Sequence, residues 1–337
     1  MSSTEAINII TLPFVVSVCL LILAISVDLL IGDPSPTTPW KFQYKLHPTV
    51  WMGKLTKALE PYFKNQNRKI EKLNGVFLAL IIILVFTLPV YFGLFFIYTW
   101  TGFGFLLYAF LGAVILKLVI CIKLETNWAK AVAKALESGD LDEARKYSHF
   151  SRRNSENLTG EQISSAVIES MAENLIDFKL SSILSYAFLG VSGAVAFRAI
   201  NTLDGMVGFK DKEHIHIGWF SANLDTVVNY IPARLTAVLI VLASAILGED
   251  YKKAWTIARR DHANTPSRNH GWPMAAMAGV LHVRLEKPGQ YTLGEQEETL
   301  SSSKIINALR IRDVVIVLCV LLALPIIWLV RLYIFPY

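Results

Sequence analysis

Three carboxylate side chains recur at helical spacing in the stretch "IESMAENLIDF". Glu169, Glu173 and Asp177 are each four residues apart, so one α-helix would place all three on a single face. Like charges at this spacing repel one another, and a bound cation relieves the repulsion. Carboxylate oxygens suit Mg²⁺, whose coordination shell a substrate phosphate often completes. The spacing therefore predicts a magnesium site, and a solvated helix face is the structural alternative.

A second polar group follows an apolar, glycine-containing run, in the stretch "RAINTLDGMVGFK". Its hydrogen-bonding residues are Arg198, Asn201, Asp204 and Lys210. Gly205 and Gly208 lie among them and permit close backbone approach or a positive φ. Asp204 could bind a metal or orient a nucleophile, while Arg198 and Lys210 could bind anionic oxygens. The alternative is a helix end with a glycine cap and a solvated lysine.

Two further stretches carry groups suited to acid–base chemistry or to anion binding. Asp28 falls in the last turn of an apolar run, where an ionisable group is costly and usually functional. His47 follows the turn at Asp33 and precedes a proline, and histidine can act as a general acid or base near neutral pH. In "RRDHANTPSRNHGWPMAAMAGV", the polar loop around Asn269 leads into an apolar helix whose N-terminus could bind an anion. A structural histidine and a simple helix cap are the alternatives.

The composition indicates what kind of scaffold must position these groups. The chain has 337 residues, of which 53% are hydrophobic and 18% are charged, whereas about 25% of a soluble domain is charged. The net charge is +5. Its basic residues lie in loops between apolar runs, so membrane topology and anionic headgroups explain them better than nucleic acid does. No CxxC, Walker A or GxGxxG pattern occurs, which gives no basis for a zinc site, a P-loop or a Rossmann fold.

Several apolar runs approach the length of about twenty residues that a helix needs to cross a bilayer. They cover residues 11–31, 76–98, 103–122, 231–248 and 313–335. Residues 183–200 form a shorter, glycine-interrupted run that could be re-entrant. We therefore predict an all-α integral membrane protein, in which residues 1–337 form a single domain. It would be a bundle of about four to six transmembrane or membrane-embedded helices with a helical cytoplasmic loop at 123–182.

The charge distribution predicts how the bundle is oriented. Residues 41–74, 123–182 and 249–312 are rich in Lys and Arg, so the positive-inside rule places these three segments in the cytoplasm. The region 183–248 must then cross the membrane an even number of times. If both of its apolar runs crossed fully, residues 201–230 would lie outside. If neither did, those residues would line a cavity open to the cytoplasm.

Five motifs occur in order between residue 28 and about residue 294. They are "GDP" with "HPTVWMG", then "IESMAEN", "NTLDGMVGFK", "NYIPARL" and "NHGWPMAAMAGVLHVRL". Together they resemble the adenosylcobinamide-phosphate synthases, membrane proteins of cobalamin biosynthesis often called CbiB or CobD. The departures from the family pattern include Gly205, where the family has Ser, and Met274, where many members have an acid. Others lie at Asn154, in the run 221–226 and at Arg268.

The resemblance implies formation of an amide bond. The family joins a propionate carboxylate of adenosylcobyric acid to (R)-1-aminopropan-2-ol O-phosphate, or to the free amino alcohol, with ATP and Mg²⁺ activating the carboxylate. On this resemblance we assign catalytic roles to Glu169, Glu173, Asp204 and His47. Substrate or nucleotide binding is assigned to Asp33, Asn174, Arg198, Asn201, Lys210, Arg234 and Asn269. The predicted metal ligands are Glu173, Asp177 and Asp204.

The same resemblance predicts where the protein works and with what. We expect a multi-pass protein of the plasma membrane with its active site on the cytoplasmic side, in contact with lipid, and no nucleic-acid partner. Other late membrane enzymes of the cobalamin pathway are possible partners. Two rival interpretations are a transporter for an anionic metabolite and a scaffold without catalytic activity. The enzymatic hypothesis requires Glu169, Asp204, His47 and Asn269 to face one cavity.

Overall fold

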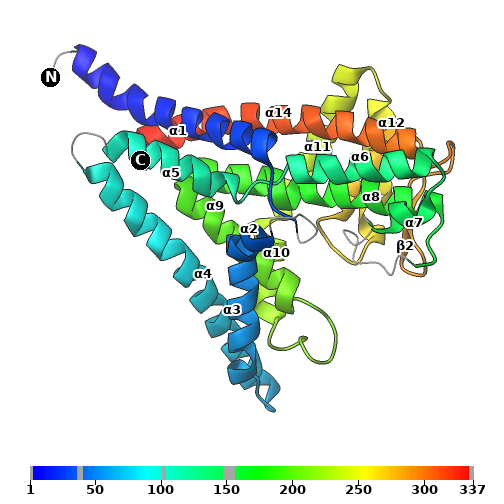
Figure 1. Ribbon diagram of the computed structural model, residues 1–337, viewed down its shortest axis with the longest axis horizontal. Helices are drawn as coiled ribbons and strands as arrows, with labels where there is room; N and C mark the ends of the chain where they lie inside the picture. The colour runs from blue at the N-terminus through cyan, green and yellow to red at the C-terminus, as the bar shows by residue number, and fades with distance from the viewer. Residues whose placement is uncertain (1–2, 36–40, 101–103, 147–155, 334–337) are drawn as a thin grey trace. The chain divides into compact units, whose positions relative to one another are not determined.

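The computed structural model describes residues 3–35, 41–100, 104–146 and 156–333, and it is almost entirely helical (Figure 1). In these ranges five segments are long and apolar enough to cross a membrane. They are Pro13–Ile31, Arg68–Thr99, Gly160–Val207, Tyr230–Leu247 and Ser302–Leu332. Many large apolar side chains on them are exposed, including Phe92 and Phe96, as expected for surfaces that face lipid. The prediction of an all-α integral membrane protein is confirmed.

The chain divides into two compact units, each built from segments that are distant in the sequence. The first unit comprises Met1–Lys123, Ser181–Val228 and Leu322–Tyr337. The second comprises Leu124–Leu180 and Asn229–Leu321. Each unit has its own helices and its own buried polar groups, and the two are described separately.

The first unit is organised around helix α9 (Ser181–Val207), which packs against four of its other helices. Its elements are α1 (Ser3–Ile31), α2 (Lys41–Leu46), α3 (Pro48–Phe63), α4 (Arg68–Thr99), α5 (Gly104–Lys117), α9, α10 (Trp219–Val228) and the last part of α14 (Ser302–Tyr333), from Leu322 onward. Helix α9 packs against α3, α4, α5 and α10, and Leu203 joins Leu78 and Ile82 of α4 in a buried apolar cluster. Close approach also requires glycine, since a Cβ on Gly75 of α4 would lie 2.0 Å from the carbonyl oxygen of Ile217.

Two of the predicted spans of this unit differ in detail from a simple crossing helix. The run predicted at 103–122 contains α5, which ends at Lys117 and is a short apolar helix. The run predicted at 183–200 lies within α9, where Gly190 has a φ of 69° and breaks the regular helical geometry. Glycine tolerates this backbone conformation because it has no Cβ.

The second unit places a small hairpin beside a group of helices. Its elements are α6 (Lys123–Glu137), α7 (Leu141–Lys146), α8 (Gly160–Leu175), the π-helical turn η2 (Ile176–Leu180), α11 (Tyr230–Leu247), α12 (Tyr251–Asp261), the 3₁₀ turn η3 (His262–Asn264), α13 (Gly271–Leu281), β1 (Leu285–Lys287), β2 (Tyr291–Leu293) and the first part of α14 (Ser302–Tyr333). Helix α13 is buried along its whole length and packs against α8, α11 and α12. The antiparallel strands β1 and β2 lie against α8 and α13.

The local sequence explains where helix α8 begins. Thr159 accepts a hydrogen bond from the backbone of Gln162, and the Gln162 side chain accepts one from the backbone of Thr159. This reciprocal capping box satisfies two backbone donors that would otherwise lack partners at the start of α8. The cap fixes the point from which Glu169 and Glu173 are placed on successive turns.

Candidate functional site

The predicted site residues fall into both units. Asp33, His47, Arg198, Asn201, Asp204 and Lys210 belong to the first, and Glu169, Glu173, Asn174, Asp177, Arg234 and Asn269 belong to the second. Within each unit some of these residues contact one another, as Arg198 and Asn201 do in the first and Arg234 and Asn269 do in the second. The expectation that residues of both groups face one cavity stays a prediction.

Glu169 is a buried carboxylate with both oxygens engaged. Only 2% of the residue is exposed. Its Oε1 accepts a hydrogen bond from the Ser165 hydroxyl at 2.6 Å, and its Oε2 accepts one from the Tyr291 hydroxyl at 2.7 Å. Ser165 in turn accepts a hydrogen bond from the backbone of Glu286 at 2.9 Å. Glu169 therefore holds the β1–β2 hairpin against α8, and its orientation is fixed.

Glu173 lies one helical turn further on and is in a different situation. It is half-buried, and within the described ranges its carboxylate makes no hydrogen bond or ion pair. The negative charges of Glu169 and Asp177 act on it, as do the positive charges that His270 and Lys287 can carry. A half-buried carboxylate that has no partner within the described ranges, and on which charges of both signs act, is suited to bind a cationic ligand group.

Asp177 does not lie on the same regular helix as the two glutamates. It is in η2, which begins one residue after α8 ends. A π-helical turn has wider i→i+5 bonding and often occurs at functional sites. Here Asp177 Oδ1 lies 3.3 Å from Nε2 of His270. The predicted common face is therefore interrupted by a change of helix type that the spacing did not indicate.

The same turn orients Lys179 toward a buried ionic network that also contains Asn174. Glu125 accepts hydrogen bonds from Asn174 Nδ2 at 2.9 Å, from Lys179 Nζ at 2.7 Å and from Arg312 Nη1 at 2.9 Å. Glu125, Lys179 and Arg312 are all at least 95% buried. The network joins α6, η2 and α14, so Asn174 has a structural partner in addition to its predicted role in binding.

Arg234 and Asn269 contact each other at the start of α13. Arg234 Nη1 donates to Asn269 Oδ1 at 3.0 Å and to the carbonyl of Tyr230 at 2.7 Å. The guanidinium also lies over the Tyr230 ring, 3.5 Å from its centroid. Such a stacked and hydrogen-bonded arginine keeps its charge in a fixed position. The two residues that sequence patterns assigned to binding are thus brought together.

In the first unit, a lysine that the motif analysis did not select joins two acidic residues. Lys117 Nζ donates to the Gly32 carbonyl at 2.6 Å and pairs with Asp33, and it lies 3.9 Å from Asp28 Oδ1. Asp28 Oδ2 accepts backbone hydrogen bonds from Ile122 and Lys123. Burial raises the pKa of Asp33, but the nearby His47 and the Lys117 charge more than offset this and hold it below the ordinary value.

His47 serves as the N-terminal cap of α3. Its Nδ1 accepts from the backbone N–H of Thr49 at 3.4 Å and lies 2.8 Å from the Thr49 hydroxyl. Because a backbone N–H can only donate, the neutral ring carries its proton on Nε2, which lies 3.7 Å from Asp33 Oδ1. In this geometry His47 presents a donor and not a free lone pair. Its predicted catalytic role stays a prediction.

Arg198 holds together two parts of the first unit. The residue is 2% exposed. Its Nη2 donates to the Val119 carbonyl at 2.5 Å, and its Nη1 donates to Asn201 Oδ1 at 3.1 Å. Arg198 also lines an apolar cavity of about 370 Å³, together with Pro48 and Met52. Arg198 is thus a buried positive charge at the edge of an apolar space.

Asp204 and Lys210 lie at and beyond the end of α9. Asp204 is half-buried, whereas Lys210 is exposed. A Cβ on Gly208 would lie 2.1 Å from Asp204 Oδ1, so glycine is required for the carboxylate to occupy this position. Gly208 therefore serves close approach, as predicted for the glycines of this motif.

Comparison with known proteins gives this arrangement a family. The sequence model described as CobD/Cbib protein matches residues 21–322. A probable cobalamin biosynthesis protein CobD of Methanothermobacter thermautotrophicus is 36% identical over 306 residues, which cover 91% of this chain and 96% of that protein. The chain belongs to the CobD/CbiB family. A cobalamin biosynthesis protein CobD of Dehalococcoides mccartyi is 32% identical over 292 residues, covering 85% of this chain and 91% of that protein. No solved structure matches the chain.

For this CobD/CbiB chain, the donor set limits how magnesium could bind. Among the described residues, no three His, Cys, Asp or Glu side chains are grouped so that they could hold a metal ion. Mg²⁺ is commonly held by one or two carboxylates together with substrate phosphates and water. Glu173, whose carboxylate has no partner among the described residues, fits that mode. The predicted set of Glu173, Asp177 and Asp204 stays a prediction.

Motif reasoning missed four residues that contact the predicted site residues or act on them through charge. Ser165 and Tyr291 hold Glu169, Lys287 acts on Glu173, and Lys117 pairs with Asp33. Only Lys117 carried a usable signal, because an ionisable residue in an apolar run is usually functional. Tyr291 and Lys287 come from a hairpin whose packing against α8 no local pattern reveals.

Proposed function

We propose that this protein is an adenosylcobinamide-phosphate synthase, an acid–amine ligase of cobalamin biosynthesis. It would join a propionate carboxylate of adenosylcobyric acid to (R)-1-aminopropan-2-ol O-phosphate, or to free aminopropanol, at the expense of ATP. Membership of the CobD/CbiB family supports the pathway. The observation that supports the chemistry is Glu173, a half-buried glutamate without a hydrogen-bond or ion-pair partner in the described ranges. The charges of His270, Lys287 and two further carboxylates act on it.

The proposed reaction has two steps whose atoms balance. First, a propionate oxygen attacks the γ-phosphorus of ATP, which forms an acyl phosphate and releases ADP. Then the amine attacks the acyl carbon, inorganic phosphate leaves, and the nitrogen loses the proton that it cannot keep in the amide. Mg²⁺ bound with ATP would supply charge neutralisation for the phosphates.

The residues of the second unit suit the second step. An amine arrives at neutral pH as an ammonium, which a carboxylate binds and from which a base must take a proton before attack. Glu173 can do both, because its oxygens have no partner within the described ranges. Glu169 is less suited, because it is only 2% exposed and the Ser165 and Tyr291 hydroxyls already donate to its two oxygens. We therefore assign Glu173 to the amine and Glu169 to positioning.

The first unit would contribute binding. Its apolar cavity with Arg198 at the edge suits a ligand that combines an apolar surface with an anionic group. Asn201 is held by Arg198, and Asp204 is held close to Gly208. We propose that these residues, with Asp33 and Lys210, bind the corrinoid or the nucleotide. The protein would reside in the plasma membrane with this chemistry on the cytoplasmic side, where ATP is available.

The test is amide formation by the full-length protein in lipid nanodiscs. The assay supplies adenosylcobyric acid, aminopropanol phosphate, ATP and Mg²⁺ and follows the corrinoid product by chromatography. Glu173→Gln is compared with Glu161→Gln, which changes an exposed glutamate of the same helix. We expect product from the wild type and from the control, and at least a hundredfold lower rate from Glu173→Gln. A folded wild type that binds the corrinoid without turnover would contradict the proposal and favour transport or scaffolding.

A further inference from the structure

The β1–β2 hairpin presents two polar side chains on its buried face. In its antiparallel register Leu285 lies opposite Leu293, and Lys287 lies opposite Tyr291. Cross-strand partners, and residues two apart on one strand, share a face. Leu285 and Leu293 are fully buried, and the Tyr291 hydroxyl reaches Glu169 on α8. Lys287 therefore lies on the face of the hairpin that packs toward the carboxylates.

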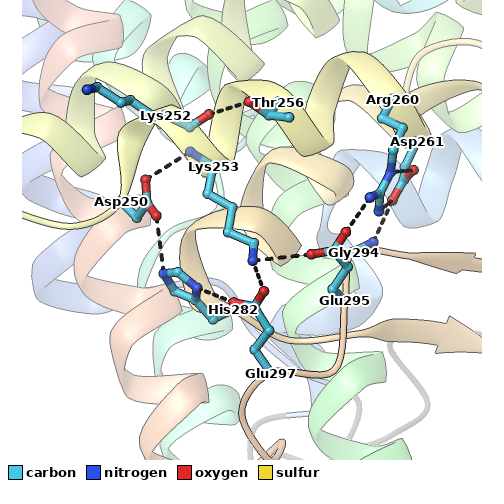
Figure 2. A network of polar contacts seen from close by, with 10 residues as sticks. All are labelled: Asp250, Lys252, Lys253, Thr256, Arg260, Asp261, His282, Gly294, Glu295 and Glu297. Atoms are coloured by element: carbon cyan, nitrogen blue, oxygen red, sulfur yellow. Dashed lines mark hydrogen bonds and ion pairs between the residues drawn. The ribbon is translucent and has the colours of Figure 1, made fainter.

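An ionic network holds the end of this hairpin in place (Figure 2). The backbone N–H of Gly294 donates to Asp261 Oδ2 at 2.7 Å. In Figure 2, Lys253 extends between Glu295 and Glu297 and forms an ion pair with each of them. His282, just after α13, contacts Glu297 through Nδ1 at 2.8 Å.

The network ties the segment after β2 to α12 and to the end of α13. At the other strand, Ser165 binds the backbone of Glu286. A segment anchored at both strands can hold its side chains in a defined position for a ligand.

Lys287 and Glu173 carry opposite charges and influence each other, but in the described part of the chain they form no ion pair. Lys287 is half-buried, and its charge acts on Glu173. In the described part of the chain, however, neither side chain has an ion-pair partner within 4.0 Å. Lys287 belongs to β1 and Glu173 to α8, and these two elements pack against each other. A short ligand with a positive and a negative end would bridge the two side chains.

We propose that Glu173 and Lys287 are the two ends of a subsite for the amino-alcohol phosphate. The ammonium group would bind Glu173 and the phosphate would bind Lys287. The inference rests on the proposed function and goes beyond it, because it makes Lys287 the residue that distinguishes the phosphorylated from the free amino alcohol. The polyphosphate of ATP offers the same chemistry to Lys287, so the experiment must separate the two sources.

The experiment measures steady-state kinetics in nanodiscs with each amine and with ATP varied in turn. Lys287→Gln is compared with Lys287→Arg and with Lys252→Gln, an exposed lysine of α12 whose ammonium is outside the network (Figure 2). We expect Lys287→Gln to raise KM for aminopropanol phosphate about tenfold or more, as loss of a charge-assisted hydrogen bond would. KM for free aminopropanol and for ATP should not change, and Lys287→Arg should retain most of the affinity.

Other outcomes overturn the proposal. An increase in KM for ATP alone would assign Lys287 to the nucleotide, and unchanged KM values for all substrates would remove it from the site. A binding titration of aminopropanol phosphate, by calorimetry on wild type and Lys287→Gln, needs no turnover. If the wild type makes no amide, the proposed function fails. The subsite fails separately if the two proteins bind the ligand equally.

Discussion

Replacing Tyr291 by phenylalanine should loosen the β1–β2 hairpin while leaving the rest of the second unit folded. The change removes one hydroxyl, which donates to Glu169 Oε2 at 2.7 Å. Glu169 is only 2% exposed, so water cannot easily replace the lost donor. A hydrogen bond to a charged group contributes about 1.5–3 kcal/mol. The free energy that separates the docked hairpin from its locally opened form should fall by that amount.

Hydrogen exchange measures this local opening directly. When opening is rapid compared with exchange, the exchange rate of a protected amide follows the opening equilibrium. A loss of about 1.5–3 kcal/mol predicts roughly 10- to 150-fold faster exchange in the peptides that cover Leu285–Leu293. The protein would be labelled in nanodiscs and digested for mass spectrometry. Tyr251→Phe is the matched control, because that tyrosine is 44% exposed on α12.

The result that would refute the reasoning is specific. If the hairpin of Tyr291→Phe exchanges at the wild-type rate, the bond to Glu169 does not hold the hairpin. If exchange accelerates equally in α8, α13 and the hairpin, the substitution destabilises the whole unit and the hairpin has no separate opening. Accelerated exchange confined to the hairpin would support its role as an element anchored to the carboxylate helix.

Three other predictions concern the packing around the sites. Glu125→Gln should lower the free energy of unfolding by about 3–5 kcal/mol, because it leaves Lys179 buried without its carboxylate partner. Thermal unfolding should show a lower unfolding temperature, which Lys179→Met partly restores. An unchanged unfolding temperature would contradict this reasoning. Hydrogen bonds from Lys253 and His282 lower the pKa of Glu297 from 4.5 to about 2. The stabilisation that ionised Glu297 gives to the folded segment after β2 is therefore complete above about pH 4.5 and is lost as the pH falls toward 2. Hydrogen exchange in that segment, corrected for intrinsic exchange rates, should accelerate over that pH range. Gly208→Ala should displace the Asp204 carboxylate and shift the local backbone, because the new Cβ would lie 2.1 Å from Asp204 Oδ1 and 2.6 Å from the Asp204 carbonyl oxygen. We expect amide formation to fall at least tenfold. Full activity would exclude that carboxylate from the site.

The sequence by itself determined the class of the protein and its family. Long apolar runs and helical spacing are local properties, so hydropathy was enough to predict an all-α membrane protein. The repeated interval of four residues was enough to place Glu169 and Glu173 on one helix. The ordered motifs were enough to indicate the CobD/CbiB family, which the comparisons confirm. None of these inferences required knowing which segments pack together.

The tertiary structure decided which hydrogen-bond and ion-pair partners these side chains have. Glu169 and Tyr291 are 122 positions apart, and Lys117 and Asp33 are 84 apart. Such pairs form only after helices from distant parts of the chain have packed, and no periodicity encodes them. The turn η2 likewise separates Asp177 from the regular helix that carries the glutamates. Two glutamates on one helix thus differ in their surroundings, because Tyr291 and Ser165 hydrogen-bond to Glu169, whereas no described residue pairs with the carboxylate of Glu173.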